Sequence, residues 1–165
     1  MAEAKTLKRA RRDKAAGKAP TTQAGEFVRE EIHHIREGKH GARSAKQAIA
    51  IGLSKARRAG VKLPRPPASA SPGTKKSAPY AARAARSHRK PSPRRSRAIE
   101  KALKRESRAA ASHEALARQA RASARQRGPV ARKAAARKAV RTKGPRVRRA
   151  AAKKAATTRR RHLSA

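Results

Sequence analysis

The last third of the chain carries a dense set of cations that could bind a polyanion. From residue 115 to residue 165 there are eighteen Lys or Arg and no Asp or Glu. A sixteen-residue unit occurs twice in this tail, at 127–142 and 143–158, with nine identical positions and three exchanges between Lys and Arg. A unit that keeps its charge and its alanines suits a repeated polyanion, and the phosphate backbone of nucleic acid is the first candidate.

Helical spacing would place the cations of each unit close together. Lys133, Arg137 and Arg141 recur every four residues and would share one side of a helix. Their repulsion is expected to keep that helix unfolded at low salt until phosphates neutralise the charge. We interpret the tail as a sequence-independent binder of duplex DNA, and the alternative is a solvated tail that only confers solubility. The tail residues predicted to bind nucleic acid are Arg132, Lys133, Arg137, Lys138, Arg141, Lys143, Arg148, Arg149, Lys153 and Lys154.

A second basic motif, Ser92-Pro93-Arg94-Arg95, precedes the tail. It resembles the Ser-Pro-basic-basic units of linker-histone and sperm-histone tails, which lie in the minor groove of A·T-rich DNA. The resemblance implies that Arg94 and Arg95 contact this narrow and strongly negative groove. A plain linker sequence is the alternative interpretation of these four residues.

A third basic segment, Gly38-Lys39-His40-Gly41 followed by Arg43, leads into a predicted helix. A glycine-rich basic loop at a helix N-terminus can hold a phosphate, so Lys39 and Arg43 are predicted phosphate contacts. The segment is not a P-loop, because the Gly-x-x-x-x-Gly-Lys-Ser/Thr spacing is absent. A loop that simply needs two glycines to turn is the alternative.

No catalytic centre, metal site or cofactor is predicted. The chain has no Cys and a single Asp, Asp13, and no nucleophile has a His and a carboxylate beside it. His33, His34 and His40 lack the His-Glu-x-x-His spacing of zinc enzymes, and His33 and Glu37 are expected to face solvent. With one Phe and one Tyr, the chain also lacks the aromatic platforms on which single-stranded nucleic acids stack. We therefore expect a binding protein and not an enzyme.

The elements that must position these residues are predicted to be helical. The net charge is +39 on 165 residues, and large apolar side chains concentrate between residues 27 and 63, so only a small core is expected. We expect an all-α protein, with a small helical hairpin and long basic arms that are largely disordered or conditionally helical. No apolar run approaches the ~20 residues of a membrane span. The expected location is therefore cytoplasmic and nucleoid-associated, without membrane partners.

Start and stop signals mark the hairpin. The first helix is predicted from about residue 25 to residue 37, with Thr22 as its cap and Gly38 as its stop. Ser44 and Gln47 form a capping box for the second helix, and Gly60 suits its C-terminal end. The predicted segments are a basic N-terminal arm at 1–19, the hairpin at 20–63, a Pro/Ser-rich linker at 64–97, a marginal helix at 98–127 and the repeat tail at 128–165.

Two stretches of the hairpin resemble a known family. They are TQAGEFV at residues 22–28 and KHGARSAKQAIAIGLSKARRAG at residues 39–60. They resemble small basic bacterial proteins that carry a domain of unknown function and a Lys/Ala-rich tail similar to that of linker histone. The resemblance implies a bacterial origin and a histone-like tail, and it assigns no catalytic residue.

Three functions stay open at this point. Duplex DNA binding by the tail is the first, and an RNA-binding or ribosome-associated protein would carry the same tail. The third is an adaptor that binds a protein partner, or a second copy of itself, through residues 20–63, with a tail that only localises it. Competition between duplex DNA and duplex RNA separates the first two functions, and capture of partners by residues 1–63 tests the third.

Overall fold

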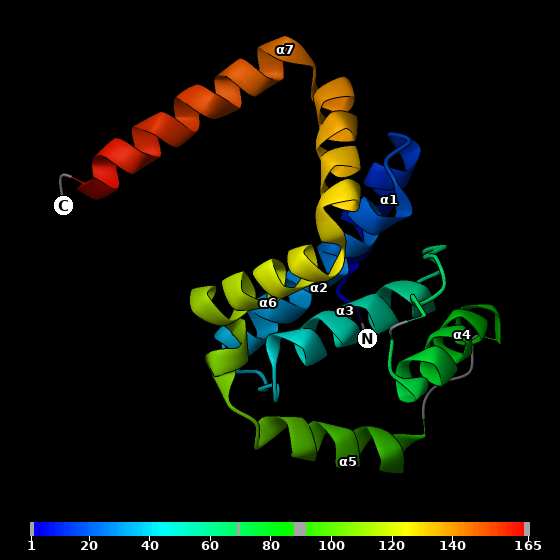
Figure 1. Cartoon of the computed structure of the whole chain (residues 1–165). Coiled ribbons are helices and arrows are strands. Elements are labelled where there is room, and N and C mark those ends of the chain that lie inside the picture. Colours follow the sequence, from blue (N-terminus) through cyan, green and yellow to red (C-terminus); the bar gives the residue numbers. More distant parts are fainter. Residues whose placement is uncertain (1, 69, 88–91, 164–165) are drawn as a thin grey trace. The chain divides into compact units, whose positions relative to one another are not determined.

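The structure is a computed structural model that describes residues 2–68, 70–87 and 92–163 (Figure 1). All secondary structure in these residues is helical, which confirms the all-α prediction. The helices are α1 (Ala4–Ala15), α2 (Pro20–Arg36), α3 (Ala45–Arg58), α4 (Pro72–Ser87), α5 (Pro93–Lys104), the short 3-10 helix η1 (Arg108–Ala111), α6 (His113–Gln126) and α7 (Gly128–Leu163). The chain divides into two compact units, residues 1–119 and 120–165. Within the described residues, no helix is both long and apolar enough to cross a membrane.

Helix α2 is the centre of the first unit, since it contacts α1, α3 and η1. One side of α2 buries Phe27 completely, in a cluster with Ala10 of α1 and Ala56 of α3. Toward its C-terminal end α2 carries Ile32 and Ile35, which pack in a second cluster against alanines of α3 and η1. Because most of the partners are alanines, this core depends more on close approach of the backbones than on large side chains.

The closest approach of α2 and α3 is at Gly52. A Cβ at this position would lie 2.7 Å from the Cα of Val28, which is closer than real Cβ atoms come to a neighbouring backbone. Ala45 and Ala48, on the same side of α3, are buried. The small residues on this side of α3 therefore let α2 approach closely.

The ends of α3 follow the predicted signals. The hydroxyl oxygen of Ser44 accepts a hydrogen bond from the N–H of Gln47 at 3.2 Å, and the Gln47 side chain accepts one from the N–H of Arg43 at 2.7 Å. After the helix, Gly60 has a φ of 85°. Glycine adopts this left-handed conformation at little cost, and it lets the next N–H groups bond the last carbonyls of the helix.

The start of α2 differs from the prediction. The helix begins at Pro20 and not at about residue 25, and Thr22 lies inside the helix and not at its cap. Pro20 occupies the first turn, where a proline has no intrahelical N–H bond to lose and its φ is already helical. Gly38 follows the end of α2 with a φ of 78°, as predicted.

The predicted N-terminal arm contains a packed helix. Within residues 1–19, α1 lies against α2, and Ala10 contributes to the cluster around Phe27. Thr6 and Asp13 of α1 are also buried. The apolar residues of this segment are too small and too few to predict packing from their spacing, so the sequence indicated only a basic arm.

The predicted linker at 64–97 also contains a packed helix, which corrects our expectation that no packed element lies there. Helix α4 contacts α3 and buries Ala78 and Ala81, although Pro79 lies inside it. Alanine is the best helix former, and Pro72 stands in the first turn, where it does not break a helix. Residues 69 and 88–91 of the predicted linker lie outside the described residues.

The helix predicted at 98–127 is divided into the C-terminal part of α5, η1 and α6. Two backbone hydrogen bonds accompany the break: the N–H of Gly41 donates to the carbonyl of Leu103 at 2.9 Å, and the N–H of Ala42 donates to the carbonyl of Ser107 at 3.1 Å. These bonds tie residues 103–107 to the loop between α2 and α3. Alanines of η1 can therefore cover the isoleucines of α2.

The second unit consists of the end of α6 and helix α7. Helix α7 is interrupted at Gly144, whose φ of 64° and ψ of 169° are not helical. Gly128, sixteen residues earlier, has a φ of 71°. Each sequence repeat therefore contains a glycine in the left-handed conformation, followed by a proline that begins a helical segment. Proline is favoured at this first helical position.

Candidate nucleic-acid interface

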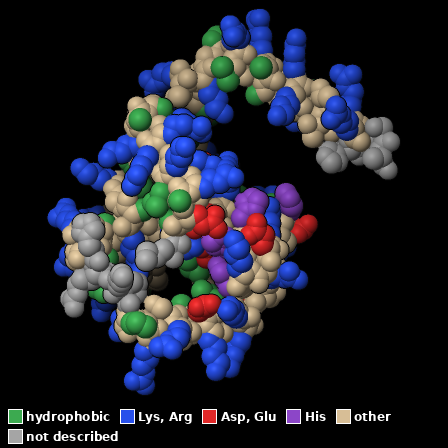
Figure 2. Space-filling model, turned by 180° about the vertical axis from the view of Figure 1, so that it is seen from behind, with side chains coloured by type: hydrophobic (Ala, Val, Ile, Leu, Met, Phe, Trp, Pro, Cys, Tyr) green, Lys and Arg blue, Asp and Glu red, His purple; other side chains and the backbone are tan. Residues whose placement is uncertain are grey.

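The cations of the tail are presented to solvent. Every Lys and Arg from residue 118 to residue 161 is exposed, including all ten tail residues predicted to bind nucleic acid. Lys and Arg side chains line the tail over its described length (Figure 2). The segment contains no Asp or Glu. This surface suits a polyanion, because a phosphate can reach each side chain without any rearrangement of a core.

The sequence repeat is also a repeat of contacts. The Nε of Arg132 donates to the carbonyl of Gly128 at 3.3 Å, and the Nε of Arg148 donates to the carbonyl of Gly144, also at 3.3 Å. The threonines near the ends of the two units repeat a second contact, in which the hydroxyl donates to the carbonyl four residues earlier, at 2.9 Å and 3.0 Å. A guanidinium has five N–H donors, so these two arginines keep most of theirs for a phosphate.

The prediction omitted eight tail cations that are equally exposed. They are Arg118, Arg121, Arg125, Arg127, Arg146, Arg159, Arg160 and Arg161. The signal that would have included them is the scarcity of large apolar side chains, since a helix without an apolar side leaves every cation in solvent.

The carboxylates are concentrated in the first unit and are engaged there. All nine acidic residues precede residue 115. Eight of them form ion pairs with Lys, Arg or His side chains of the same unit. Because these pairs lie between residues 3 and 106, they do not reduce the charge of the tail.

The predicted phosphate contacts in the loop, Lys39 and Arg43, differ in their surroundings. The Nζ of Lys39 lies 3.2 Å from a carboxylate oxygen of Glu37 and 3.3 Å from one of Glu3. The hydrogen bond to Glu37 raises the pKa of Lys39, and hydrogen bonds from His34 and Lys39 lower the pKa of Glu3. The Arg43 side chain is 82% exposed, and its Nε lies 3.7 Å from one carboxylate, that of Glu106. The neighbouring loop amides bond residues 103–107. Phosphate contact here stays a prediction, for which Arg43 is better placed than Lys39.

Arg94 and Arg95 lie in the first turn of α5 and are exposed. Ser92 precedes the helix and Pro93 is its first residue, so the motif begins a helix. Further along α5, an ion pair joins two residues four apart, with the Nζ of Lys104 2.8 Å from a carboxylate oxygen of Glu100. Minor-groove contact by the two arginines stays a prediction.

Together, fold and surface define a basic, all-helical protein with a cationic repeat tail. Residues 11–66 match a family of unknown function (DUF6496), about one third of the chain. The match agrees with the expected domain of unknown function, and it does not include the tail. Comparisons with the curated proteins and with the solved structures found no match.

Proposed function

We propose that this chain is a histone-like, nucleoid-associated protein that binds duplex DNA largely without regard to sequence, through its tail. The observation that carries the proposal is the pair of equivalent helical units, exposed and rich in Lys and Arg, in a segment without Asp or Glu. Each unit contains six Lys or Arg. Sixteen residues of helix are about 24 Å long, a length over which duplex DNA carries roughly fourteen phosphates. One unit can therefore neutralise fewer than half of the phosphates beside it.

The physical driving force is the release of counterions from DNA. Each phosphate that pairs with a Lys or Arg side chain releases condensed cations, so affinity falls steeply with salt. A tail of this kind contacts phosphates and not base edges, and phosphate contacts carry no direct sequence information. The first unit would then fix the position of the tail or select a partner, by self-association or by binding a second protein.

We further propose that the helices of the tail form fully only when the charge is neutralised. Within one unit, cations four residues apart destabilise a helix by about 0.2–0.5 kcal/mol per pair. Far-UV circular dichroism of the full chain should therefore show a gain of helix when duplex DNA is added at low salt. A tail variant with glutamine in place of its lysines and arginines should show no such gain. Equal helix content with and without DNA would contradict this proposal.

The experiment that tests the function is a salt titration of the full chain against duplex DNA, with duplex RNA as competitor. We expect a steep linear fall of log affinity with log salt, and a preference for DNA over RNA. Equal or tighter binding to RNA would replace DNA by RNA as the ligand, since duplex RNA is also recognised by its backbone and shape. Weak binding to both at physiological salt would sink the proposal and leave the tail as an accessory to a protein-binding first unit.

A further inference from the structure

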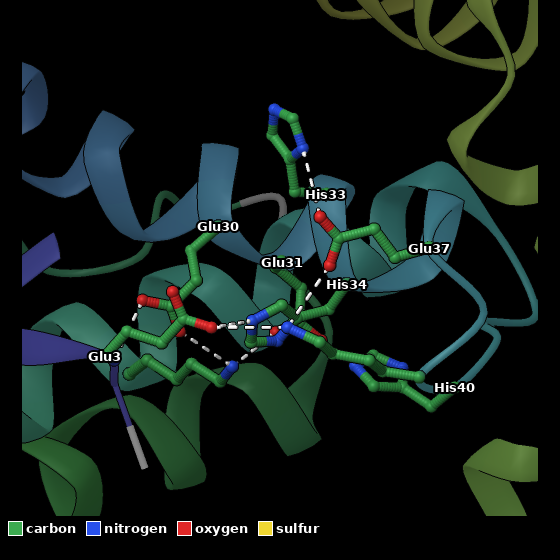
Figure 3. A network of polar contacts seen from close by, with 9 residues as sticks. Glu3, Glu30, Glu31, His33, His34, Glu37 and His40 are labelled. Atoms are coloured by element: carbon green, nitrogen blue, oxygen red, sulfur yellow. Dashed lines mark hydrogen bonds and ion pairs between the residues drawn. The ribbon is translucent and has the colours of Figure 1, made fainter. Parts of the chain in front are cut away.

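Glu31, His34 and His40 form a cluster in the first unit that the tail function does not use (Figure 3). One potential ligand atom from each of the three residues lies within 4.8 Å of the other two. The Glu31 side chain is only 1% exposed, and those of His34 and His40 are 13% and 15% exposed. Two imidazoles and one carboxylate are a donor set that zinc-class divalent ions prefer.

The fold builds this cluster from a helix and the loop after it. Glu31 and His34 are three residues apart in α2, so they lie on the same side of the helix, one turn from each other. After α2 ends, the chain turns at Gly38 and brings the Nε2 of His40 to 3.3 Å from Oε1 of Glu31. Two ligands about 2.1 Å from a tetrahedral ion are about 3.4 Å apart, so this separation suits a shared ion.

Each of the two histidines has one ring nitrogen beside an oxygen that can orient the imidazole. The Nδ1 of His40 lies 3.0 Å from the carbonyl oxygen of Gly41, so a proton on Nδ1 leaves the Nε2 lone pair facing Glu31. The Nε2 of His34 lies 2.8 Å from a carboxylate oxygen of Glu3. A carbonyl or carboxylate that fixes one ring nitrogen orients the imidazole and strengthens the other nitrogen as a ligand.

The charge around the cluster also favours a divalent cation. Ion pairs link two groups of residues, and the backbone N–H of Glu3 joins the groups by donating to a carboxylate oxygen of Glu30 at 3.0 Å. The resulting polar network contains Glu3, Glu30, Glu31, His33, His34, Glu37, Lys39, His40 and Lys55. With neutral imidazoles the network has four carboxylates and two ammonium groups, a net charge of −2 in a chain of net charge +39. A divalent ion would neutralise this charge.

The buried Glu31 carboxylate is incompletely satisfied in the described residues. Neither of its oxygens accepts a hydrogen bond of good geometry. Its charge is opposed by the Lys55 ammonium group, 2.7 Å from Oε2, which also lies 3.2 Å from Glu30. Lys55 can keep its contact with Oε2 while Oε1 binds an ion beside His40. His34 also lines an open depression of about 360 Å³, together with Glu3, Glu30 and Glu37 among others, whereas Glu31 and His40 do not line it.

We propose that Glu31, His34 and His40 bind one zinc-class divalent cation, held in place by Glu3 behind His34. The ion would connect α2 to the loop that residues 103–107 cover. This site is independent of the tail and of any nucleic acid.

The test is a titration of the full chain with Zn²⁺ in the absence of DNA, for the wild type and for three variants. His34→Ala and His40→Ala should each weaken zinc binding by at least about tenfold. His33→Ala is the matched control, because His33 is adjacent in sequence to His34, 62% exposed and ion-paired with Glu37. It should bind zinc like the wild type.

Two further measurements keep the result decisive. Circular dichroism in metal-free buffer shows whether each variant retains the helix content of the wild type. If a histidine-to-alanine variant loses helix, the comparison uses His40→Gln in its place. X-ray absorption of the zinc-loaded chain should show two imidazole nitrogens and one carboxylate oxygen at about 2.0–2.2 Å. Equal affinity for all variants, or a zinc ion surrounded only by water, would overturn the proposal. His40 would then lie between the Gly41 carbonyl and Glu31 without a metal.

Discussion

Deletion of residues 127–165 is expected to weaken binding to every duplex DNA sequence alike, by at least about a hundredfold at low salt. The deletion removes fifteen of the 48 Lys and Arg residues, all in the segment that carries the repeat. If all fifteen contacted phosphates, the slope of log affinity against log salt would fall by at most about 14, since each contact contributes about 0.9. The measurement is a salt titration against several unrelated duplexes, before and after the deletion.

The matched control keeps the tail at full length and removes only its charge. Replacing the fifteen lysines and arginines by glutamine preserves helix propensity, because glutamine is nearly as good a helix former as lysine or arginine. We expect this variant to bind DNA as weakly as the deletion. A variant in which the order of residues 127–165 is shuffled keeps the charge and should retain most of the affinity. Loss of binding to some duplexes and not to others would contradict the mechanism, because phosphate contacts do not read sequence.

Gly52→Ala is expected to destabilise the first unit by about 2 kcal/mol and to lower its melting temperature by about 10 °C. The new methyl group would lie 2.7 Å from the Cα of Val28, which is backbone and cannot rotate away. The helices α2 and α3 would have to separate, and the alanine contacts around Ala48 and Ala56 would loosen. Urea unfolding followed by circular dichroism measures the loss.

Gly25→Ala is the control, because it is the same substitution inside α2 without the clash. Gly25 is exposed, and a Cβ there meets no atom within 4 Å. Alanine has a higher helix propensity than glycine, so this variant should gain about 0.5–1 kcal/mol of stability. The two variants should therefore change stability in opposite directions. If Gly52→Ala were also stabilising, α2 and α3 would not pack in contact at this position.

The sequence predicted the elements whose signals are local. Ser44, Gln47, Gly38 and Gly60 act on residues at most a few positions away, so the bounds of α3 and the end of α2 could be predicted from the chain alone. The helical spacing of Ile32 and Ile35 indicates the buried side of α2 in the same way. Pro20 was treated as a boundary, although proline is favoured in a first turn, and the start of α2 was therefore misplaced.

The elements that the sequence did not predict depend on distant partners. Helix α4 buries two alanines, and α1 buries Ala10 beside the polar residues Thr6 and Asp13. The spacing of such residues does not distinguish a packed side from a solvated one. The break between α5 and α6 involves bonds to a loop about sixty residues earlier. His40 joins Glu31 and His34 only because the chain turns after α2, so no single helical spacing connects the three ligands. Exposure of the ten predicted tail cations, in contrast, does not depend on distant partners and could be predicted from composition.

The bonds from Gly41 and Ala42 to residues 103–107 also have a consequence for the order of events during synthesis. Ile35, the second isoleucine of α2, is completely buried. Of the residues in its cluster, those of η1 and Leu116 are the last to be synthesised. At about 5–20 residues per second, the 53 residues from 63 to 116 take roughly 3–10 s to translate. During that interval the finished α2 and α3 present an uncovered apolar side, to which chaperones or a neighbouring nascent chain can bind. A fragment that stops at residue 66, the end of the family match, would remain in that exposed state.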